Sequence, residues 1–283
     1  MPRILVVDGN VAAIRARQAA LVGYDSGTGY ARVLRRLLPS AVCDVICPAD
    51  GPAPLPAGVG LADYDGVTVT GSALNIYNQD GAVLRQLEVA RAVFAAGVPF
   101  FGSCWGLQLA VTAAGGTVRA NPRGREFGFA RRIRLTEAGR SHPLYAGKPE
   151  VFEAPTIHRD EVATLPAEAT VLADNEMGVQ AAVFTHGRGT FWGVQYHPEY
   201  DPVDIAAAAL RYRQQLVDEG LFADLAALKA FAAELQVLQE RPADPPLVWK
   251  HGLGPAMTDG SLRLRELGNW LERQVLPRSA RHG

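Results

Sequence analysis

The sequence is poor in cysteine, in excess charge of either sign and in long hydrophobic runs. Its 283 residues include only three cysteines, which are too few and too unevenly spaced for a disulfide framework and favour a reducing, cytoplasmic compartment. The formal net charge of −1 gives no field that would attract nucleic acid or an anionic membrane. No apolar run approaches the length of a membrane span, and the start MPRILVVDGN is typical of a first strand rather than a signal peptide. We therefore expect neither nucleic acid nor a membrane as a partner.

Two of the cysteines, Cys43 and Cys47, lie close together in the stretch AVCDVICPAD. Their Cys-x3-Cys spacing can suggest a metal site, but the sequence offers no matching second pair. Alternation along the stretch favours two packed residues of one strand. We expect no metal and no cofactor.

The order of strand and helix patterns indicates an α/β fold. Over the first 116 residues, short β-branched runs such as RILVVD and YDGVTVTG alternate with helical stretches, which is typical of a mostly parallel, doubly wound sheet. Between residues 117 and 196 strand patterns follow one another without long helices, and Gly187 and Gly189 suit a tight antiparallel connection. We predict one such domain over residues 1–216, with a mixed sheet extended by antiparallel strands.

Two regions do not follow this alternation of strands and helices. Residues 9–30, between the first strand and its helix, could form a lid or an interface, but we expect mainly a solvated loop with one short helix. Residues 217–283 are predicted to form a helical C-terminal extension. Its last helix carries an apolar stripe that can close the core or bury against a second copy in a homodimer. The stripe consists of Leu264, Leu267, Trp270 and Leu271.

The segment FFGSCWGLQLA places Cys104 between Gly102 and Gly106. A cysteine at the end of a buried strand, entering a helix through small residues, has the geometry of a nucleophile elbow. The positive end of the helix favours the thiolate, and the main-chain N–H of Trp105 would face a developing oxyanion. A cysteine that is simply buried at a tight strand-to-helix connection gives the same pattern.

The segment GVQYHPEY offers a base and a group to orient it. His197 and Glu199 are two residues apart, so they face the same side of an extended segment, and Pro198 disfavours helix at His197. His197 could take the thiol proton and protonate the leaving group, while Glu199 would fix its tautomer. On its own, His-Pro-Glu fits a surface turn equally well.

Taken together, FGSCWGLQLA and WGVQYHPEY resemble the two signatures of the class I glutamine amidotransferases, and most closely a stand-alone glutaminase of the GMP synthase type. The resemblance covers roughly residues 1 to 215. It implies a flavodoxin-like fold, Cys104 as the nucleophile, and His197 and Glu199 as the rest of a catalytic triad. It also implies that Gln108, one helical turn after the cysteine, helps to hold the substrate.

The segment VTVTGSALNIYN occupies the position of the oxyanion loop in this family. The resemblance implies that main-chain N–H groups of Gly71 or Ser72 join that of Trp105 around the tetrahedral oxyanion. The loop lacks the proline usual in the family and also fits a plain Thr-Gly-Ser turn. We further expect the large side chain of Trp105 to line the cleft and narrow the pocket.

Two more segments resemble family features. GREFGF is similar to the segment that lines the glutamine pocket, which implies substrate-binding roles for Glu126, Phe127 and Gly128; a charged residue flanking a strand is an equal alternative for Glu126. TIHRDEVATLP resembles the His-x-Asp-x-Val stretch of the family. That resemblance places His158 near the edge of the cleft, in a structural or gating role.

Two activities fit these residues. The first is hydrolysis of glutamine to glutamate and ammonia through a γ-glutamyl thioester on Cys104, with the ammonia used by a separate synthetase chain because no synthetase fingerprint follows in the sequence. The second is a γ-glutamyl hydrolase or peptidase acting on a γ-glutamyl amine or peptide, which a wider pocket mouth around Trp105 and Phe127 would favour. A non-catalytic regulatory or binding protein on the same fold is the least favoured interpretation, because every member of the triad is present.

Overall fold

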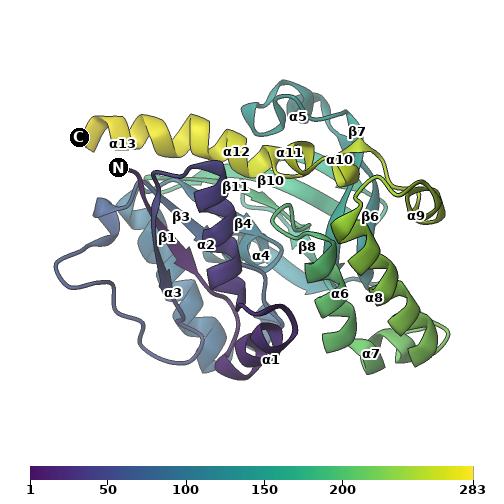
Figure 1. Cartoon of the computed structure of the whole chain (residues 1–283). Helices are drawn as coiled ribbons and strands as arrows, with labels where there is room; N and C mark the ends of the chain where they lie inside the picture. The colour runs from purple at the N-terminus through teal and green to yellow at the C-terminus, as the bar shows by residue number, and fades with distance from the viewer. Residues whose placement is uncertain (283) are drawn as a thin grey trace.

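A nine-stranded mixed sheet forms the centre of the computed structural model, which describes residues 1–282 (Figure 1). The strand order is β2-β1-β3-β4-β11-β10-β9-β6-β7. The parallel part consists of β2 (Val42–Ile46), β1 (Arg3–Val7), β3 (Gly66–Val69), β4 (Phe100–Ser103) and β11 (Gly189–Val194). The antiparallel part consists of β10 (Gly178–His186), β9 (Thr170–Asn175), β6 (Glu126–Leu135) and β7 (Val151–His158). The predicted doubly wound sheet with an antiparallel extension is confirmed.

Two connections in the antiparallel part are short, those between β9 and β10 and between β10 and β11. β10 and β11 pair from Ala181 with Val194 to His186 with Gly189, and Gly187 between them has a φ of 58°, which glycine tolerates well. β5 (Thr117–Ala120) and β8 (Asp160–Thr164) form a separate two-stranded sheet. The remaining short elements are α5 (Glu137–Ser141) and the 3-10 turns Leu61–Asp63, Ile76–Asn78 and Pro143–Tyr145.

Helices cover both faces of the parallel strands (Figure 1). On one face, α2 (Ser26–Leu37) and the C-terminal helices pack over Ile4 and Val6. On the other face, α3 (Gly81–Ala96) and α4 (Trp105–Ala113) pack over Leu5 and Val7. Because successive side chains of β1 point to opposite faces, this one apolar strand supplies both hydrophobic clusters.

The expectation that residues 9–30 are mainly a loop was wrong. α1 occupies Ala12–Val22 and α2 begins at Ser26, so most of the segment is helical. Gly23 ends α1 in the left-handed conformation, with a φ of 83°, and the Asp25 side chain caps α2 by accepting from the N–H of Thr28. α1 has no side-chain N-cap and buries only Gln18, so its sequence carries neither a start signal nor an apolar stripe.

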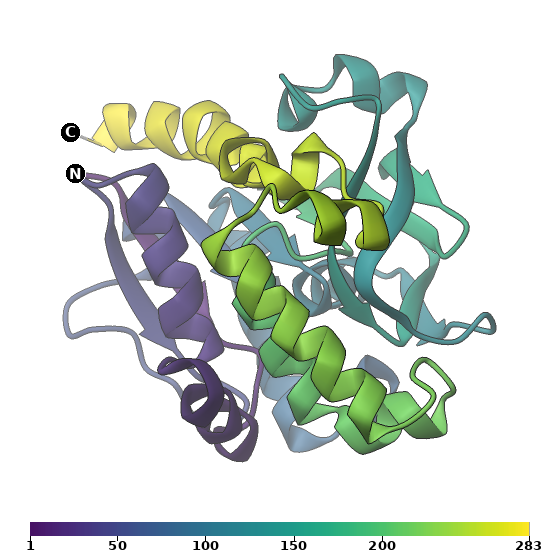
Figure 2. The same cartoon turned by 45° about the vertical axis from the view of Figure 1, so that its right-hand side comes forward.

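The C-terminal part of the chain is a series of helices, with α8 lying along α6 (Figure 2). The predicted boundary at residue 216 falls inside α7. Within residues 1–282, no helix combines the length and the apolar character needed to cross a membrane. The series comprises α6 (Pro202–Arg211), α7 (Arg213–Asp218), α8 (Leu225–Glu240), α9 (Pro245–His251), α10 (Pro255–Thr258), α11 (Gly260–Arg263), α12 (Arg265–Trp270), a π-helical turn (Leu271–Val275) and α13 (Leu276–His282).

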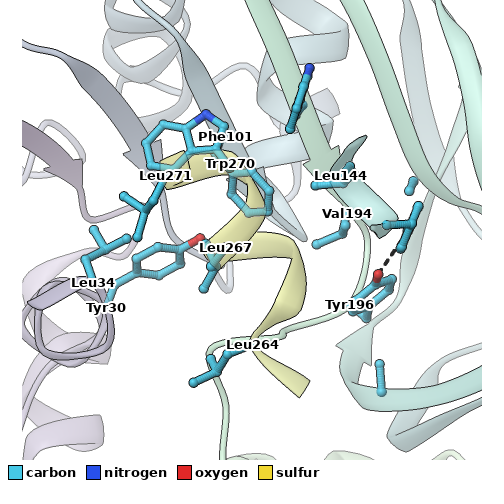
Figure 3. Close-up of a cluster of buried hydrophobic side chains, with 14 of the residues drawn as sticks. Tyr30, Leu34, Phe101, Leu144, Val194, Tyr196, Leu264, Leu267, Trp270 and Leu271 are labelled. Carbon is cyan, nitrogen blue, oxygen red and sulfur yellow. Dashed lines mark hydrogen bonds between the residues drawn. The ribbon is translucent and has the colours of Figure 1, made fainter. Parts of the chain in front are cut away.

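The apolar stripe near the end of the chain closes the core (Figure 3). Trp270 is fully buried, and its ring centroid lies 5.8 Å from that of Phe101 in β4. Gly66 in β3 accommodates this ring, since a Cβ there would stand 2.7 Å from an indole carbon of Trp270. The C-terminal helices and the parallel strands therefore share one hydrophobic cluster.

A buried ion pair also ties these helices to the sheet. Lys148 Nζ lies 2.9 Å from Oε1 of Glu266 in α12, and both side chains are almost completely buried. The same carboxylate accepts a 2.6 Å hydrogen bond from the hydroxyl of Tyr196, which in turn lies 2.9 Å from the hydroxyl of Tyr145. Tyr196 directly precedes His197, so α12 holds the segment that carries the predicted base.

Candidate active site

Cys104 occupies a strained turn between β4 and α4. Its φ of 52° and ψ of −101° are rare for a residue with a side chain. A Cβ on Gly102 would stand 2.4 Å from the carbonyl carbon of Gly106, and a Cβ on Gly106 would stand 2.6 Å from the carbonyl oxygen of Val69. The two glycines thus let strand, helix and neighbouring strand approach closely, while Cys104 itself carries the backbone strain.

His197 is held on several sides. Its Nδ1 lies 2.7 Å from Oε1 of Glu199, and its main-chain N–H donates to the carbonyl of Pro155 at 2.8 Å. The ring of Tyr200 stacks on the imidazole. Gly71 lies so close that a Cβ there would stand 2.5 Å from Cε1 of His197. Because Nδ1 faces a carboxylate, Nε2 is the nitrogen left for proton transfer with the sulfur and the leaving group.

The surroundings of His197 favour its protonated form. Burial lowers the pKa of His197, but the charge of Glu199, its hydrogen bond and Cys104 raise it, and the balance is a pKa of about 10. The ring is therefore expected to carry a proton at neutral pH. Such an imidazolium can protonate a departing amine.

Cys104 and His197, the predicted nucleophile and base, line one cavity of about 380 Å³, here called the triad cavity. Its walls come from the carboxyl ends of parallel strands and from α4, which is where ligands bind in open α/β sheets. Predicted residues that line it are Gly71, Ser72, Cys104, Gln108, His158 and His197.

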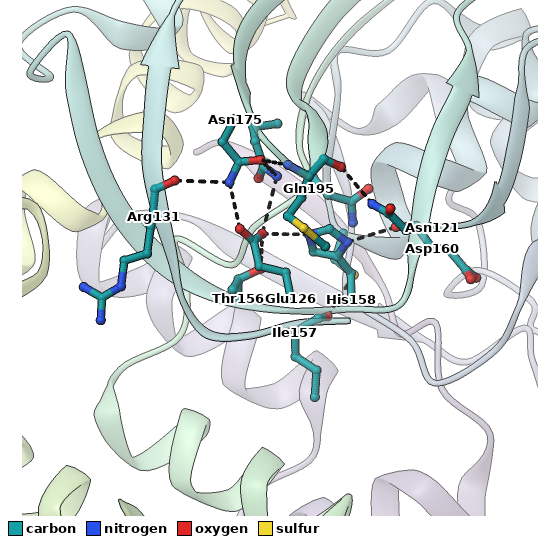
Figure 4. A network of polar contacts seen from close by, with 12 residues as sticks. Asn121, Glu126, Arg131, Thr156, Ile157, His158, Asp160, Asn175 and Gln195 are labelled. Atoms are coloured by element: carbon teal, nitrogen blue, oxygen red, sulfur yellow. Dashed lines mark hydrogen bonds and ion pairs between the residues drawn. The ribbon is translucent and has the colours of Figure 1, made fainter. Parts of the chain in front are cut away.

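Glu126 contacts His158 in a partly buried polar network (Figure 4). Its Oε2 lies 2.9 Å from Nε2 of His158, and its Oε1 accepts a 2.7 Å hydrogen bond from Nδ2 of Asn175. The other ring nitrogen of His158, Nδ1, lies 2.9 Å from the carbonyl oxygen of Asp160. Glu126 thus fixes the orientation of a cavity-lining histidine and is not itself among the residues of 1–282 that line the triad cavity.

Phe127 and Gly128 are also placed outside the lining of the triad cavity, as far as the described residues go. The ring centroid of Phe127 lies 5.9 Å from that of Phe222 and 6.1 Å from that of Phe231. Gly128 has a φ of 84°, and a Cβ there would stand 3.4 Å from the Phe231 ring. The structure therefore brings both residues against the C-terminal helices rather than the triad.

The expectation that the Trp105 side chain lines the cleft was wrong. The indole is fully buried in the hydrophobic cluster around α3 and α4. Its Nε1 donates a 2.8 Å hydrogen bond to Oε1 of Gln86. As the first residue of α4, Trp105 points its side chain back into the protein, where the indole N–H finds a buried partner.

Several residues of the triad cavity were missed from the sequence. The carboxylate of Asp160 accepts from Nδ2 of Asn75 at 2.7 Å and from the hydroxyl of Tyr77 at 3.1 Å. Arg211, in α6, lines the cavity and has a buried Nε without a hydrogen-bond partner in the described chain. Tyr200 could have been noted from its place directly after His-Pro-Glu, whereas nothing local distinguishes Arg211.

Comparisons with known proteins show which family the chain resembles. The model of the class I glutamine amidotransferases matches residues 23–211. The chain is 37% identical to a γ-glutamyl-L-1-hydroxyisopropylamide hydrolase from Pseudomonas over 99% of this chain and 95% of the relative. It is 32% identical to a GMP synthase from Streptomyces avermitilis over 62% of this chain, which spans only 31% of that relative.

Solved structures agree on the fold. A glutamine amidotransferase from Thermotoga maritima superposes with a TM-score of 0.64 at 18% identity, covering 97% of this chain and 98% of that one. A glutamine amidotransferase from Methylobacillus flagellatus gives a TM-score of 0.54 at 20% identity, covering 99% of this chain and 94% of that one. The family model matches well over half of the chain, and the resemblance seen in the two sequence motifs is confirmed. The chain belongs to the class I glutamine amidotransferase family.

Proposed function

We propose that the chain hydrolyses the amide bond of γ-glutamyl compounds through a thioester on Cys104. The observation that carries this proposal is the placement of Cys104 and His197 on one cavity, with Nδ1 of His197 bonded to Glu199. This arrangement supplies a nucleophile, a general acid and base, and a group that orients the base.

The reaction follows from these groups. The Cys104 sulfur, its proton taken by His197, attacks the γ-carbonyl carbon and forms a tetrahedral oxyanion. The carbon–nitrogen bond then breaks, and His197 gives its proton to the departing nitrogen, which leaves a γ-glutamyl thioester. A water molecule loses a proton to His197 and attacks the thioester carbon, so that glutamate leaves and the thiol is restored.

Main-chain N–H groups are proposed to hold the oxyanion. The N–H of Cys104 is already bonded to the carbonyl of Val194 at 2.8 Å, so it is not a candidate. Trp105 is the first residue of α4, and the first N–H groups of a helix have no intrahelical acceptor. Gly71 and Ser72 line the same cavity and are the second proposed source of a donor.

The amino-acid end of the substrate is proposed to lie between Gln108, Asp160 and Arg211. Gln108 is itself oriented, since its Nε2 lies 3.3 Å from Oε1 of Gln195. The buried, unpartnered Nε of Arg211 suits the α-carboxylate, because a guanidinium donor in a buried site gains most from an anion. The carboxylate of Asp160 suits the α-ammonium. Glu126 acts through His158 in this proposal.

An N-substituted γ-glutamyl amide is the favoured substrate. The similarity to the Pseudomonas hydrolase extends over nearly the whole chain and includes the C-terminal helices. Glutamine is the second candidate, with the ammonia used by a separate synthetase chain, and the similarity to GMP synthases over 62% of this chain favours it. The cytoplasmic location and the homodimer remain predictions.

The test is release of glutamate from glutamine and from γ-L-glutamyl 2-hydroxyethylamide by the purified chain. Cys104→Ala should reduce release to background, and Cys47→Ala, which removes a thiol outside the triad cavity, should leave it unchanged. Rapid denaturation during turnover should trap a γ-glutamyl adduct on the peptide that contains Cys104. Release that persists in Cys104→Ala would contradict the proposal.

A further inference from the structure

A second cavity, here called the α2 cavity, lies beside the triad cavity and has a volume of about 300 Å³. Helices α1 and α2 form one wall, and the segment that leads into α6 forms another. Its lining includes both apolar and charged side chains, among them Tyr30, Val33, Arg36, Glu199, Asp201 and Asp204.

The two cavities meet beside His197, the proposed general base. Gly71 and Tyr200 line both of them. These residues also hold the His197 ring, because Tyr200 stacks on it and a Cβ on Gly71 would stand 2.5 Å from its Cε1. The scissile nitrogen must lie beside Nε2 of His197 to receive a proton. A substituent on that nitrogen therefore starts at the boundary with the α2 cavity.

Glu199 lines the α2 cavity, and one of its carboxylate oxygens has no hydrogen-bond partner in the described chain. Glu199 is 7% exposed, and its Oε1 is bonded to His197, but its Oε2 is buried without a hydrogen bond in the described chain. The neighbouring acids are engaged: Asp201 Oδ1 accepts from the N–H groups at the start of α6, and Asp204 Oδ1 accepts from the hydroxyl of Tyr24 at 3.0 Å. A buried, unpaired acceptor is costly, so Glu199 Oε2 is suited to a ligand that brings a donor.

We propose that the α2 cavity binds the N-substituent of a γ-glutamyl amide, and that a hydroxyl or ammonium group on this substituent donates to Glu199 Oε2. This inference rests on the proposed hydrolysis. The leaving group of glutamine is ammonia, which is about the size of the water molecule that needs only ~10–15 Å³ of such space. A cavity of about 300 Å³ instead fits a small alkylamine, and Tyr30 and Val33 offer it an apolar wall.

The experiment compares three substrates of the full chain: glutamine, γ-L-glutamyl 2-hydroxyethylamide and γ-L-glutamyl n-propylamide. The last two have N-substituents of nearly equal size and differ in the terminal donor. We expect kcat/KM for the hydroxyethylamide to exceed that for the propylamide at least tenfold, because a buried polar site discriminates strongly against an analogue that leaves it unpaired.

Val33→Phe fills the α2 cavity from α2 and should lower the ratio of kcat/KM for the hydroxyethylamide over glutamine at least tenfold. Leu37→Phe is the matched control: Leu37 is also partly buried on α2 but is not among the described residues lining this cavity, so the ratio should not change. Thermal melts verify folding, and the milder Val33→Leu should move the ratio in the same direction if Val33→Phe does not fold.

The outcomes separate the two proposals. If the wild-type chain hydrolyses these amides but the substrate ratio does not respond to Val33→Phe or Val33→Leu, the α2 cavity is not the leaving-group site and the proposed hydrolysis stands. Turnover of glutamine alone, or equal turnover of the hydroxyethylamide and the propylamide, would also overturn the inference. If none of the three substrates is hydrolysed, the proposed function fails, and the inference fails with it.

Discussion

The phenol ring of Tyr200 lies nearly parallel to the imidazole of His197, with ring centroids 4.1 Å apart and an interplanar angle of 10°. His197 is buried, whereas Tyr200 is half-buried and contributes to the walls of both cavities. The stack restricts rotation of the imidazole about its bond to Cβ. Tyr200 is thus a positioning residue for the proposed general acid and base.

Replacement of Tyr200 tests this role. Tyr200→Phe keeps the stacked ring and should retain kcat within about threefold of the wild type. Tyr200→Ala removes the ring, and we expect kcat to fall on the order of 10²-fold, because small displacements of a catalytic group have effects of that size. The measurement is steady-state kinetics of both variants. Equal kcat values for Phe and Ala would rule out positioning by the stack.

Gly71 is expected to tolerate no side chain. In Gly71→Ala the new Cβ would stand 2.5 Å from Cε1 of His197, so the ring must move. We expect kcat/KM to fall on the order of 10²-fold, because small displacements of a catalytic group have effects of that size. Gly51→Ala is the control, since a Cβ there meets no atom within 4 Å. Full activity in Gly71→Ala would show that the imidazole can shift without cost.

The proton on His197 predicts the alkaline limit of activity. The pKa of His197 is about 10 in the folded chain, against 6.5 as its ordinary value. The leaving nitrogen needs this proton, so kcat/KM should decline as the pH rises towards 10. A pH profile up to pH 11 measures this decline, and a decline centred near pH 6.5 would contradict it.

The same proton affects stability. Because the folded pKa is the higher one, the protonated ring stabilises the fold fully below pH 6.5, and this contribution is lost as the pH rises through about 10. Denaturant unfolding at pH 6 and pH 10 measures the change. The variant His197→Gln should lack this pH-dependent part of the free energy of unfolding. An identical pH dependence of unfolding in the wild type and in His197→Gln would refute the prediction.

Glu126 is expected to act on stability and on His158 rather than on substrate directly. Glu126→Ala leaves Nε2 of His158 and Nδ2 of Asn175 without their carboxylate partner, and a buried unsatisfied group costs ~1–3 kcal/mol. Denaturant unfolding should show this loss. A large rise in KM with unchanged unfolding would instead indicate direct contact between Glu126 and the substrate.

The C-terminal helices are expected to contribute strongly to stability. Trp270 is fully buried against Phe101, and replacing a buried tryptophan by alanine costs ~3–5 kcal/mol. Trp249 is 89% exposed in α9, so Trp249→Ala should leave unfolding nearly unchanged and serves as the control. Unfolding of both variants in urea measures the difference. A change below ~1 kcal/mol for Trp270→Ala would contradict the packing described.

Local patterns predicted the parts of the fold that local physics determines. β1 and β4 are short apolar runs that end in turns, and the motif around Cys104 combines a strand end, small residues and a helix start, so both could be located from neighbouring residues. α1 could not be found in this way, because it lacks a cap and an apolar stripe.

Contacts between distant residues explain the other differences. The indole of Trp105 is hydrogen-bonded to Gln86, and the carboxylate of Glu126 contacts His158 and Asn175. These partners are distant in sequence, so no local spacing predicts them. The α2 cavity likewise depends on helices that come from opposite ends of the family domain. Its walls become apparent only when the fold brings residues of α2 and of the start of α6 to the same cavity.

The hydrogen bond from the Tyr196 hydroxyl to the Glu266 carboxylate has a consequence for synthesis of the chain. A ribosome makes Tyr196, the residue next to the proposed base, well before it makes the carboxylate of Glu266 that anchors it, and Trp270 follows Glu266. The nascent chain therefore contains Cys104 and His197 before it contains the helix that anchors the segment next to His197. We expect the proposed active site to become ordered only after α12 has been made and has packed against the sheet.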